Sequence, residues 1–185
     1  MTVHSFACGQ DKRLSFKEWT EVKSNIDEFP LGYLPVLKLD SGKVYSQSRA
    51  IMRYACKHGG DAGPMYPSEA EAALAVDEAM DMADELLTKC PQDPDETKKK
   101  ELREIYSREK MPKYFVYWAK RLAEGGGPFY LGTQLTLADL AVASITKMIL
   151  DSFFDYVAPS FLDPWPTLLA HAKAVSEHPL VVKNQ

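Results

Sequence analysis

The polar pair Gln47-Ser48 stands where two short apolar runs end and a helical pattern begins, which makes both side chains candidates for ligand binding. The first N–H groups of a helix lack intrahelical partners, and the positive end of the helix dipole lies beside them. A helix that begins here can therefore hold an anion, with the Ser48 hydroxyl and the Gln47 amide adding specific hydrogen bonds. The alternative interpretation is that Ser46 or Ser48 only caps the helix.

A second candidate pair, Trp19 and Lys23, is spaced i,i+4 in the segment FKEWTEVK. If this segment is helical, the indole and the ammonium lie one above the other on the same face, where both can donate hydrogen bonds. The alternative is a half-buried tryptophan covered by the apolar stem of a surface lysine.

The elements that position the Gln47-Ser48 pair can be read from the residues around it. The run 35–40, PVLKLD, alternates as a strand does, Ser41-Gly42 turns the chain, and 43–46, KVYS, follows as a second strand. Strands joined by so short a turn must be antiparallel. Apolar residues at helical spacing then predict a helix over 47–58, and Lys12 to Phe16 is interpreted as another short strand.

The Gly/Pro-rich stretch 59–67 is the best domain boundary, and we expect a first domain over 1–63 and a second over 64–185. Everything in the second domain is interpreted as helical. A capping box at 68–71 is expected to open a helix that runs to about Lys89, and one long helix is expected from Glu96 to Glu124, kinked at Pro112. A second capping box at Thr136 to Asp139 precedes an apolar helix, and a last helix is expected before His178.

Composition excludes several classes of protein. The net charge of −4 provides no basic surface for nucleic acid or anionic lipid. No apolar run approaches the roughly 18–20 residues that cross a bilayer, and the N-terminus has no signal-peptide pattern. The three cysteines, Cys8, Cys56 and Cys90, are far apart and form no CxxC pair. This favours a reducing, cytoplasmic location without a disulfide framework, a metal or a redox motif.

A strand–strand–helix unit headed by a proline, followed by an all-α domain with a capping box inside it, resembles the cytosolic glutathione S-transferases. The resemblance is strongest to the sigma-like class, which includes the haematopoietic-type prostaglandin D synthases. It rests on FKEWTEVK, LPVLKLDSGKVYSQSRAIMRYACK, PFYLGTQLTLADLAVAS and HPLV, spread over roughly residues 12–180. It implies an α+β fold, with an N-terminal thioredoxin-like α/β domain and a C-terminal helical bundle.

The resemblance also implies roles for individual residues. Pro35 would follow a cis peptide bond, and the backbone of Leu34 would pair with the cysteinyl unit of glutathione as an added strand does. Gln47 and Ser48 would bind the α-carboxylate of the γ-glutamyl group. The glycine carboxylate of glutathione would be held by two further residues, Trp19 and Lys23.

Similar proteins are homodimers, and their partner subunit brings an acidic group to the γ-glutamyl ammonium. Asp84, rather than Asp81 or Glu85 beside it, is the first choice for this group, against the alternative of a solvated helix face. Three aromatics, Tyr106, Trp118 and Phe153, are candidates for the pocket of the electrophile, although aromatics at helical spacing are more often core residues.

The N-terminus departs from the family pattern. Family members begin with strand, helix and strand, with the catalytic Tyr after the first strand, whereas only Met1 to Asp11 precede the matching segment here. We therefore expect the first helix to be missing, with or without the first strand, because a parallel crossover needs about a dozen residues. No Tyr precedes Tyr33, which leaves Ser5 and Cys8 as weak candidates for activating the thiol.

The expected function is a glutathione transferase that conjugates the glutathione thiolate to small hydrophobic electrophiles, feebly because the activating Tyr is absent. Isomerisation of a prostaglandin-like endoperoxide is a related possibility. The alternative is a non-catalytic structural or dimerisation protein, as the lens crystallins of this superfamily are. A thioredoxin-like redox protein is disfavoured by the missing CxxC.

Overall fold

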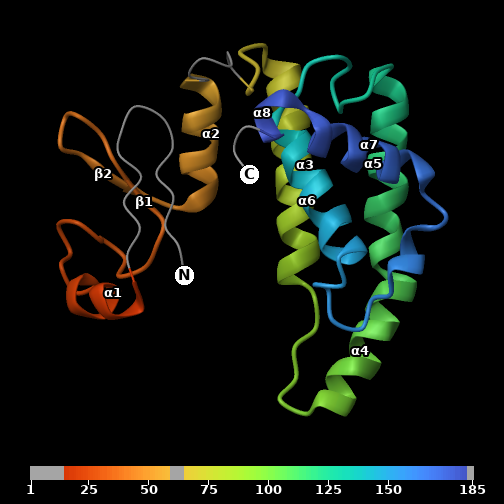
Figure 1. Ribbon diagram of the computed structural model, residues 1–185, viewed down its shortest axis with the longest axis horizontal. Helices are drawn as coiled ribbons and strands as arrows, with labels where there is room; N and C mark the ends of the chain where they lie inside the picture. The colour runs from red at the N-terminus through yellow and green to blue at the C-terminus, as the bar shows by residue number, and fades with distance from the viewer. Residues whose placement is uncertain (1–14, 59–64, 183–185) are drawn as a thin grey trace. The chain divides into compact units, whose positions relative to one another are not determined.

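The computed structural model describes residues 15–58 and 65–182, and the chain divides into two compact units at Tyr66 and Pro67 (Figure 1). The first unit combines two strands with helices, and the described part of the second is built from helices. No helix in the described ranges is both long and apolar enough to cross a membrane.

The first unit is built around a two-stranded antiparallel sheet. Its elements in chain order are α1 (Phe16–Val22), β1 (Val36–Lys38), β2 (Val44–Ser46) and α2 (Ser48–His58). Val36 pairs with Ser46, and Leu37 pairs with Tyr45. The predicted strands, their pairing and the following helix are therefore confirmed.

Ser15 caps α1, and its hydroxyl accepts a hydrogen bond from the Glu18 N–H. The predicted strand over 12–16 is therefore wrong at its last two residues, and residues 12–14 lie outside the described part of the chain. The reason is local, because a Ser-x-x-Glu box satisfies two backbone N–H groups at once and favours a helix start.

Leu37 and Ile51 are buried between the sheet and α2. A cavity of about 280 Å³ remains on this side, lined by Leu37, Leu39, Tyr45, Ala50, Ile51 and Tyr54. Its lining offers almost no polar surface, so it cannot hold a charged peptide.

The second unit is a helical bundle in which α6 packs against both α3 and α7 (Figure 1). Its elements are α3 (Ala70–Thr88), α4 (Glu96–Glu109), α5 (Met111–Gly125), α6 (Leu137–Leu150), the 3-10 turn η2 (Pro159–Leu162), α7 (Pro166–Glu177) and α8 (Pro179–Val182). Val76, Trp118 and Val142 have no exposed surface and lie at the centre of the core.

Two predicted helix boundaries in this unit are wrong. The helix predicted from Glu96 to Glu124 is two helices separated at Lys110, because Pro112 has no N–H to donate and stands in the first turn of α5, where none is required. At the start of α3 the N-cap is Glu69 rather than Ser68, and its carboxylate accepts a hydrogen bond from the Ala72 N–H.

The capping box predicted at Thr136 is confirmed. The Asp139 carboxylate accepts hydrogen bonds from the Thr136 N–H and from the Thr136 hydroxyl, both at 2.7 Å. Asp139 also accepts from the Tyr130 N–H at 2.6 Å, and so joins the loop before α6 to the helix.

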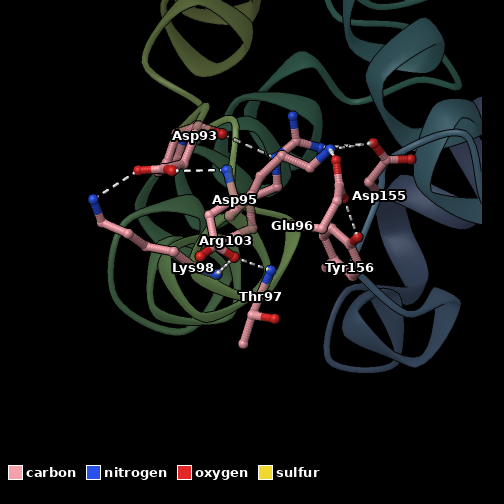
Figure 2. Close-up of polar contacts among 10 residues, drawn as sticks. Asp93, Asp95, Glu96, Thr97, Lys98, Arg103, Asp155 and Tyr156 are labelled. Carbon is pink, nitrogen blue, oxygen red and sulfur yellow. Dashed lines mark hydrogen bonds and ion pairs between the residues drawn. The ribbon is translucent and has the colours of Figure 1, made fainter.

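A polar network fixes the loop 151–157 to the first turns of α4 (Figure 2). The buried Arg103 donates to the Pro91 carbonyl at 3.0 Å and to the Asp155 carboxylate at 3.2 Å. The Tyr156 hydroxyl donates to Glu96 at 2.6 Å, and Lys98 pairs with Asp93 at 2.8 Å. Lys98 makes this ion pair while its side chain stays 63% exposed.

Candidate functional site

The strand register brings Leu34 and Pro35 close to Gln47 and Ser48. Because Val36 pairs with Ser46, the residue before Val36 and the residue after Ser46 lie at the same end of the sheet. The Leu34–Pro35 peptide bond is cis, as the family resemblance implies. The backbone ahead of β1 and the start of α2 thus form one continuous rim.

Gln47 has an unusual backbone at this rim, with φ of 78°. Its carbonyl accepts the first helical hydrogen bond of α2, from the Ile51 N–H at 3.0 Å, and Ser48 is the first residue of the helix. A left-handed conformation costs an L-residue about 1–2 kcal/mol, and such residues gather at binding and active sites. Both side chains are exposed, where a ligand can reach them.

Ser46 does not cap α2. Its hydroxyl oxygen is buried and has no hydrogen-bond partner among the residues that the structure describes. The interpretation in which Ser46 only serves as a helix cap is therefore wrong.

Trp19 and Lys23 are held against the segment that leads into Leu34. Lys23 follows α1 in helical conformation, and its N–H donates to the Trp19 carbonyl at 2.9 Å. The Trp19 ring meets the buried Phe29 ring edge to face, with centroids 5.0 Å apart. A Cβ placed on Gly32 would lie 3.6 Å from the Lys23 carbonyl oxygen, so the two backbones are in contact.

These contacts arrange three chemical functions along one edge of the first unit. The N-terminus of α2 attracts an anion, the backbone of Leu34 just before β1 can pair with a peptide, and the exposed Lys23 ammonium attracts a second anion. The arrangement therefore suits an extended peptide with a negative charge at each end.

The other predicted site residues lie elsewhere. Asp84 is half-buried in α3 of the second unit, where its carbonyl accepts from the Thr88 hydroxyl at 2.8 Å, and its role stays a prediction. Ser5 and Cys8 lie outside the described residues.

The three candidate aromatics do not form a common pocket. Tyr106 and Trp118 are buried, and the Tyr106 hydroxyl donates to the Leu86 carbonyl at 2.8 Å. Phe153 is 74% exposed on the loop after α6. Two of the three are therefore core residues, as aromatics at helical spacing usually are.

The described cysteines are poor nucleophiles. Burial raises the pKa of the Cys56 thiol to about 11, and burial also raises the pKa of Cys90. Thiolate is the reactive form, so neither side chain supplies a nucleophile near neutral pH.

Sequence reasoning indicated that Pro30 and Gly32 close the segment of α1, but it missed the contact that the turn at Gly32 makes with Lys23. Gly32 has a φ of +64°, and its N–H donates to the Phe29 carbonyl at 2.8 Å. The signal was present, because Pro30 and Gly32 punctuate a turn, but the residue that this turn would contact could not be read from it.

The chain is similar in sequence and in fold to known proteins. Residues 80–183 match the family model of the glutathione S-transferase C-terminal domain. A probable glutathione S-transferase 6 of Caenorhabditis elegans is 32% identical over 177 residues, which is 90% of this chain and 79% of that protein.

Two solved structures show the same fold. The prostaglandin synthase D of Nilaparvata lugens has a TM-score of 0.72 and 25% identity, with 96% of this chain and 83% of the other covered. A monomeric glutathione S-transferase of the hookworm Necator americanus, Na-GST-3, has a TM-score of 0.73 and 26% identity, with 94% and 82% covered. The fold is thus α+β, with a thioredoxin-like N-terminal unit and a helical C-terminal unit. From the family match over more than half of its length and from this relative, the chain belongs to the glutathione S-transferase family.

Proposed function

We propose that this protein binds glutathione and transfers its thiolate to small hydrophobic electrophiles. The observation that carries the proposal is the pairing of Val36 with Ser46, which places the start of α2 beside Leu34. Glutathione is a tripeptide with a carboxylate at each end, and the edge of the first unit offers a matching position for each.

In this proposal the γ-glutamyl carboxylate is bound by Gln47 and Ser48, where the N–H groups and the dipole of α2 favour negative charge. The cysteinyl unit pairs with the backbone of Leu34, ahead of Pro35. The glycine carboxylate is bound by Lys23 and the Trp19 indole N–H. The γ-glutamyl ammonium is left for Asp84 of a partner subunit.

The chemical step requires a thiolate, and a free thiol with a pKa near 8.5 is only slightly ionised at neutral pH. A hydroxyl beside the sulfur stabilises the thiolate, and removing one such preorganised donor costs about 2.7–4 kcal/mol of barrier. Ser5 and Cys8 stay candidates for this donor. Holding the thiol and the electrophile together contributes to the rate as well.

The test of binding is calorimetry with glutathione on the wild type and on the double variant Gln47→Ala/Ser48→Ala. We expect the double variant to bind about 5- to 150-fold more weakly, since two direct contacts of about 0.5–1.5 kcal/mol each are removed. Ser41→Ala, at the opposite end of the same sheet, is the control and should bind as the wild type does. Equal affinity of the wild type and the double variant would rule out Gln47 and Ser48 as the residues that bind the γ-glutamyl carboxylate.

Turnover with a chloronitrobenzene acceptor tests the reaction separately from binding. Glutathione binding with no conjugation above the spontaneous rate would support the alternative function, a non-catalytic member of the family. We also propose that the protein is cytoplasmic and forms a homodimer, as members of this family generally do, although one of the matched structures is described as monomeric.

A further inference from the structure

The loop that follows α6 holds an aromatic side chain out in solvent. Phe153 is exposed over most of its surface, whereas the next residue, Phe154, is buried and anchors the loop in the core. Leu150 and Tyr156, three residues away on either side, are partly exposed as well. Three large apolar side chains open to solvent within seven residues of chain are unusual on a helical bundle, and such groups are typical of interaction surfaces, in which aromatic residues are enriched.

The backbone of this loop is strained and is fixed in one conformation. Ser152 and Tyr156 have φ values of 59° and 64°, in the left-handed region that residues other than glycine rarely adopt. Such conformations persist only where their surroundings fix them, and they gather at functional sites. Figure 2 shows what fixes this loop, since the Tyr156 hydroxyl donates to Glu96 at 2.6 Å and the buried Arg103 donates to Asp155 at 3.2 Å. The aromatic ring between the two strained residues is thus presented in advance, and a partner that binds it orders little chain.

The exposed side of the loop is acidic. The stretch 148–163 contains no lysine or arginine but three aspartates, Asp151, Asp155 and Asp163. Asp151 has an exposed partner in Lys147. The cations beside Asp155 are different, because the Arg103 and Lys99 side chains are only 8% and 14% exposed, whereas the Asp155 side chain stays open to solvent. Their positive charge therefore lies behind the carboxylate, and a partner that approaches from solvent meets the carboxylate first.

We propose that the loop 151–157 is a docking surface for a cationic, amphipathic segment of another protein. The Phe153 ring packs against the apolar side of that segment, and lysine or arginine side chains of the segment pair with the open carboxylates of Asp155 and Glu96. Complementary charge is what favours this partner over a second copy of the chain or an anionic membrane, since both of these would bring like charges together. The surface uses none of the residues proposed to bind glutathione, so it is independent of the proposed function.

The probe is a fluorescently labelled peptide of about 18 residues, built from leucine and lysine at the spacing of an amphipathic helix. Its binding to the full chain is measured by fluorescence anisotropy. We expect Phe153→Ser to weaken this binding about fivefold or more, and to leave the unfolding temperature and the affinity for glutathione unchanged. Val116→Ser in α5 is the matched control, because Val116 is also largely exposed, and it should bind the peptide as the wild type does.

The docking surface is ruled out if the wild type does not bind the peptide, or if Phe153→Ser and Val116→Ser bind it equally well. A matching peptide of leucine and glutamate should not bind, and binding as tight as that of the lysine peptide would exclude the cationic partner. Phosphatidylserine vesicles that bind the wild type but not Phe153→Ser would assign the loop to a lipid surface instead. A smaller oligomer of Phe153→Ser in sedimentation would show that a second copy covers the loop.

Discussion

Asp139 and His171 form a buried polar contact between α6 and α7, with His171 Nε2 donating to Asp139 Oδ1 at 2.9 Å. Their exposed fractions are 0% and 3%. The same carboxylate accepts from the backbone N–H groups of Thr136 and Tyr130, so one side chain joins two helices and a loop.

Removing the Asp139 carboxylate should destabilise the helical unit strongly. Asp139→Ala leaves several buried donors without an acceptor, and we expect the free energy of unfolding in urea to fall by about 4 kcal/mol. Asp139→Asn should cost less, because the amide oxygen still accepts. Asp151→Ala, which removes an exposed pair with Lys147, is the control and should cost about 0.5 kcal/mol or less. Similar losses in all three variants would contradict this account.

Arg103 should contribute more to stability than its partner Asp155. Arg103→Ala deprives the Pro91 carbonyl of its hydrogen bond and opens a buried site, for an expected loss of about 2–3 kcal/mol. The Asp155 side chain is 59% exposed, so Asp155→Ala should cost about 1 kcal/mol. Urea unfolding of both variants shows which one loses more free energy of unfolding, with the exposed Lys100→Ala as the control. A larger loss in Asp155→Ala would show that the arginine is not the anchor.

The backbone conformation at position 47 should be less strained with glycine than with another residue, whereas the Gln47 side chain is proposed to bind the ligand. With φ of 78°, Gln47→Gly should be more stable than Gln47→Ala by about 1 kcal/mol. Both variants should bind glutathione more weakly, because both lack the amide. Ala123→Gly in α5 is the control at an ordinary helical position, where glycine should lower the free energy of unfolding by about 1 kcal/mol. Thermal unfolding checks the first point, and a Gln47→Gly variant less stable than Gln47→Ala would rule out the strained conformation.

Cys56 should make stability fall at alkaline pH. Its folded pKa of about 11 lies above that of an unfolded thiol, so the native state keeps a proton that the unfolded state releases. The stability contributed by the protonated thiol is therefore complete below about pH 8.5 and is lost as the pH rises toward 11. Unfolding free energies of the wild type and Cys56→Ala, measured from pH 7 to 10.5, should converge with rising pH. A constant difference across this range would disprove the linkage.

If the protein forms a homodimer as proposed, we expect α3, the helix that carries Asp84, to lie in a two-fold interface. Leu74 on this helix is 68% exposed. We expect a dimer in sedimentation at micromolar concentration and a monomer for Leu74→Glu, with Leu150→Glu at the end of α6 as control. A monomeric wild type would exclude Asp84 from a neighbour's site.

Short-range features were determined by the sequence alone. The hairpin follows from two apolar runs around Ser41-Gly42, and Thr136 is the N-cap of α6 because Asp139 stands three residues later. Both are set by residues a few positions apart, so propensity and capping chemistry are enough to predict them. One part of the candidate site, formed by Leu34, Gln47 and Ser48, could be predicted for the same reason, because the hairpin brings these residues together.

Long-range contacts were decided only by the tertiary structure. Arg103 contacts Asp155, which lies 52 residues further along the chain, and Asp139 contacts His171, which lies 32 residues further. No periodic pattern in the sequence predicts either contact. The split at Lys110 was also not predicted, because a proline can either kink a helix or stand in the first turn of a new one, as Pro112 does. The contact of Gly32 with Lys23 is of the same kind. A turn signal shows where the chain reverses, but which surface the reversed chain then meets depends on everything packed around it.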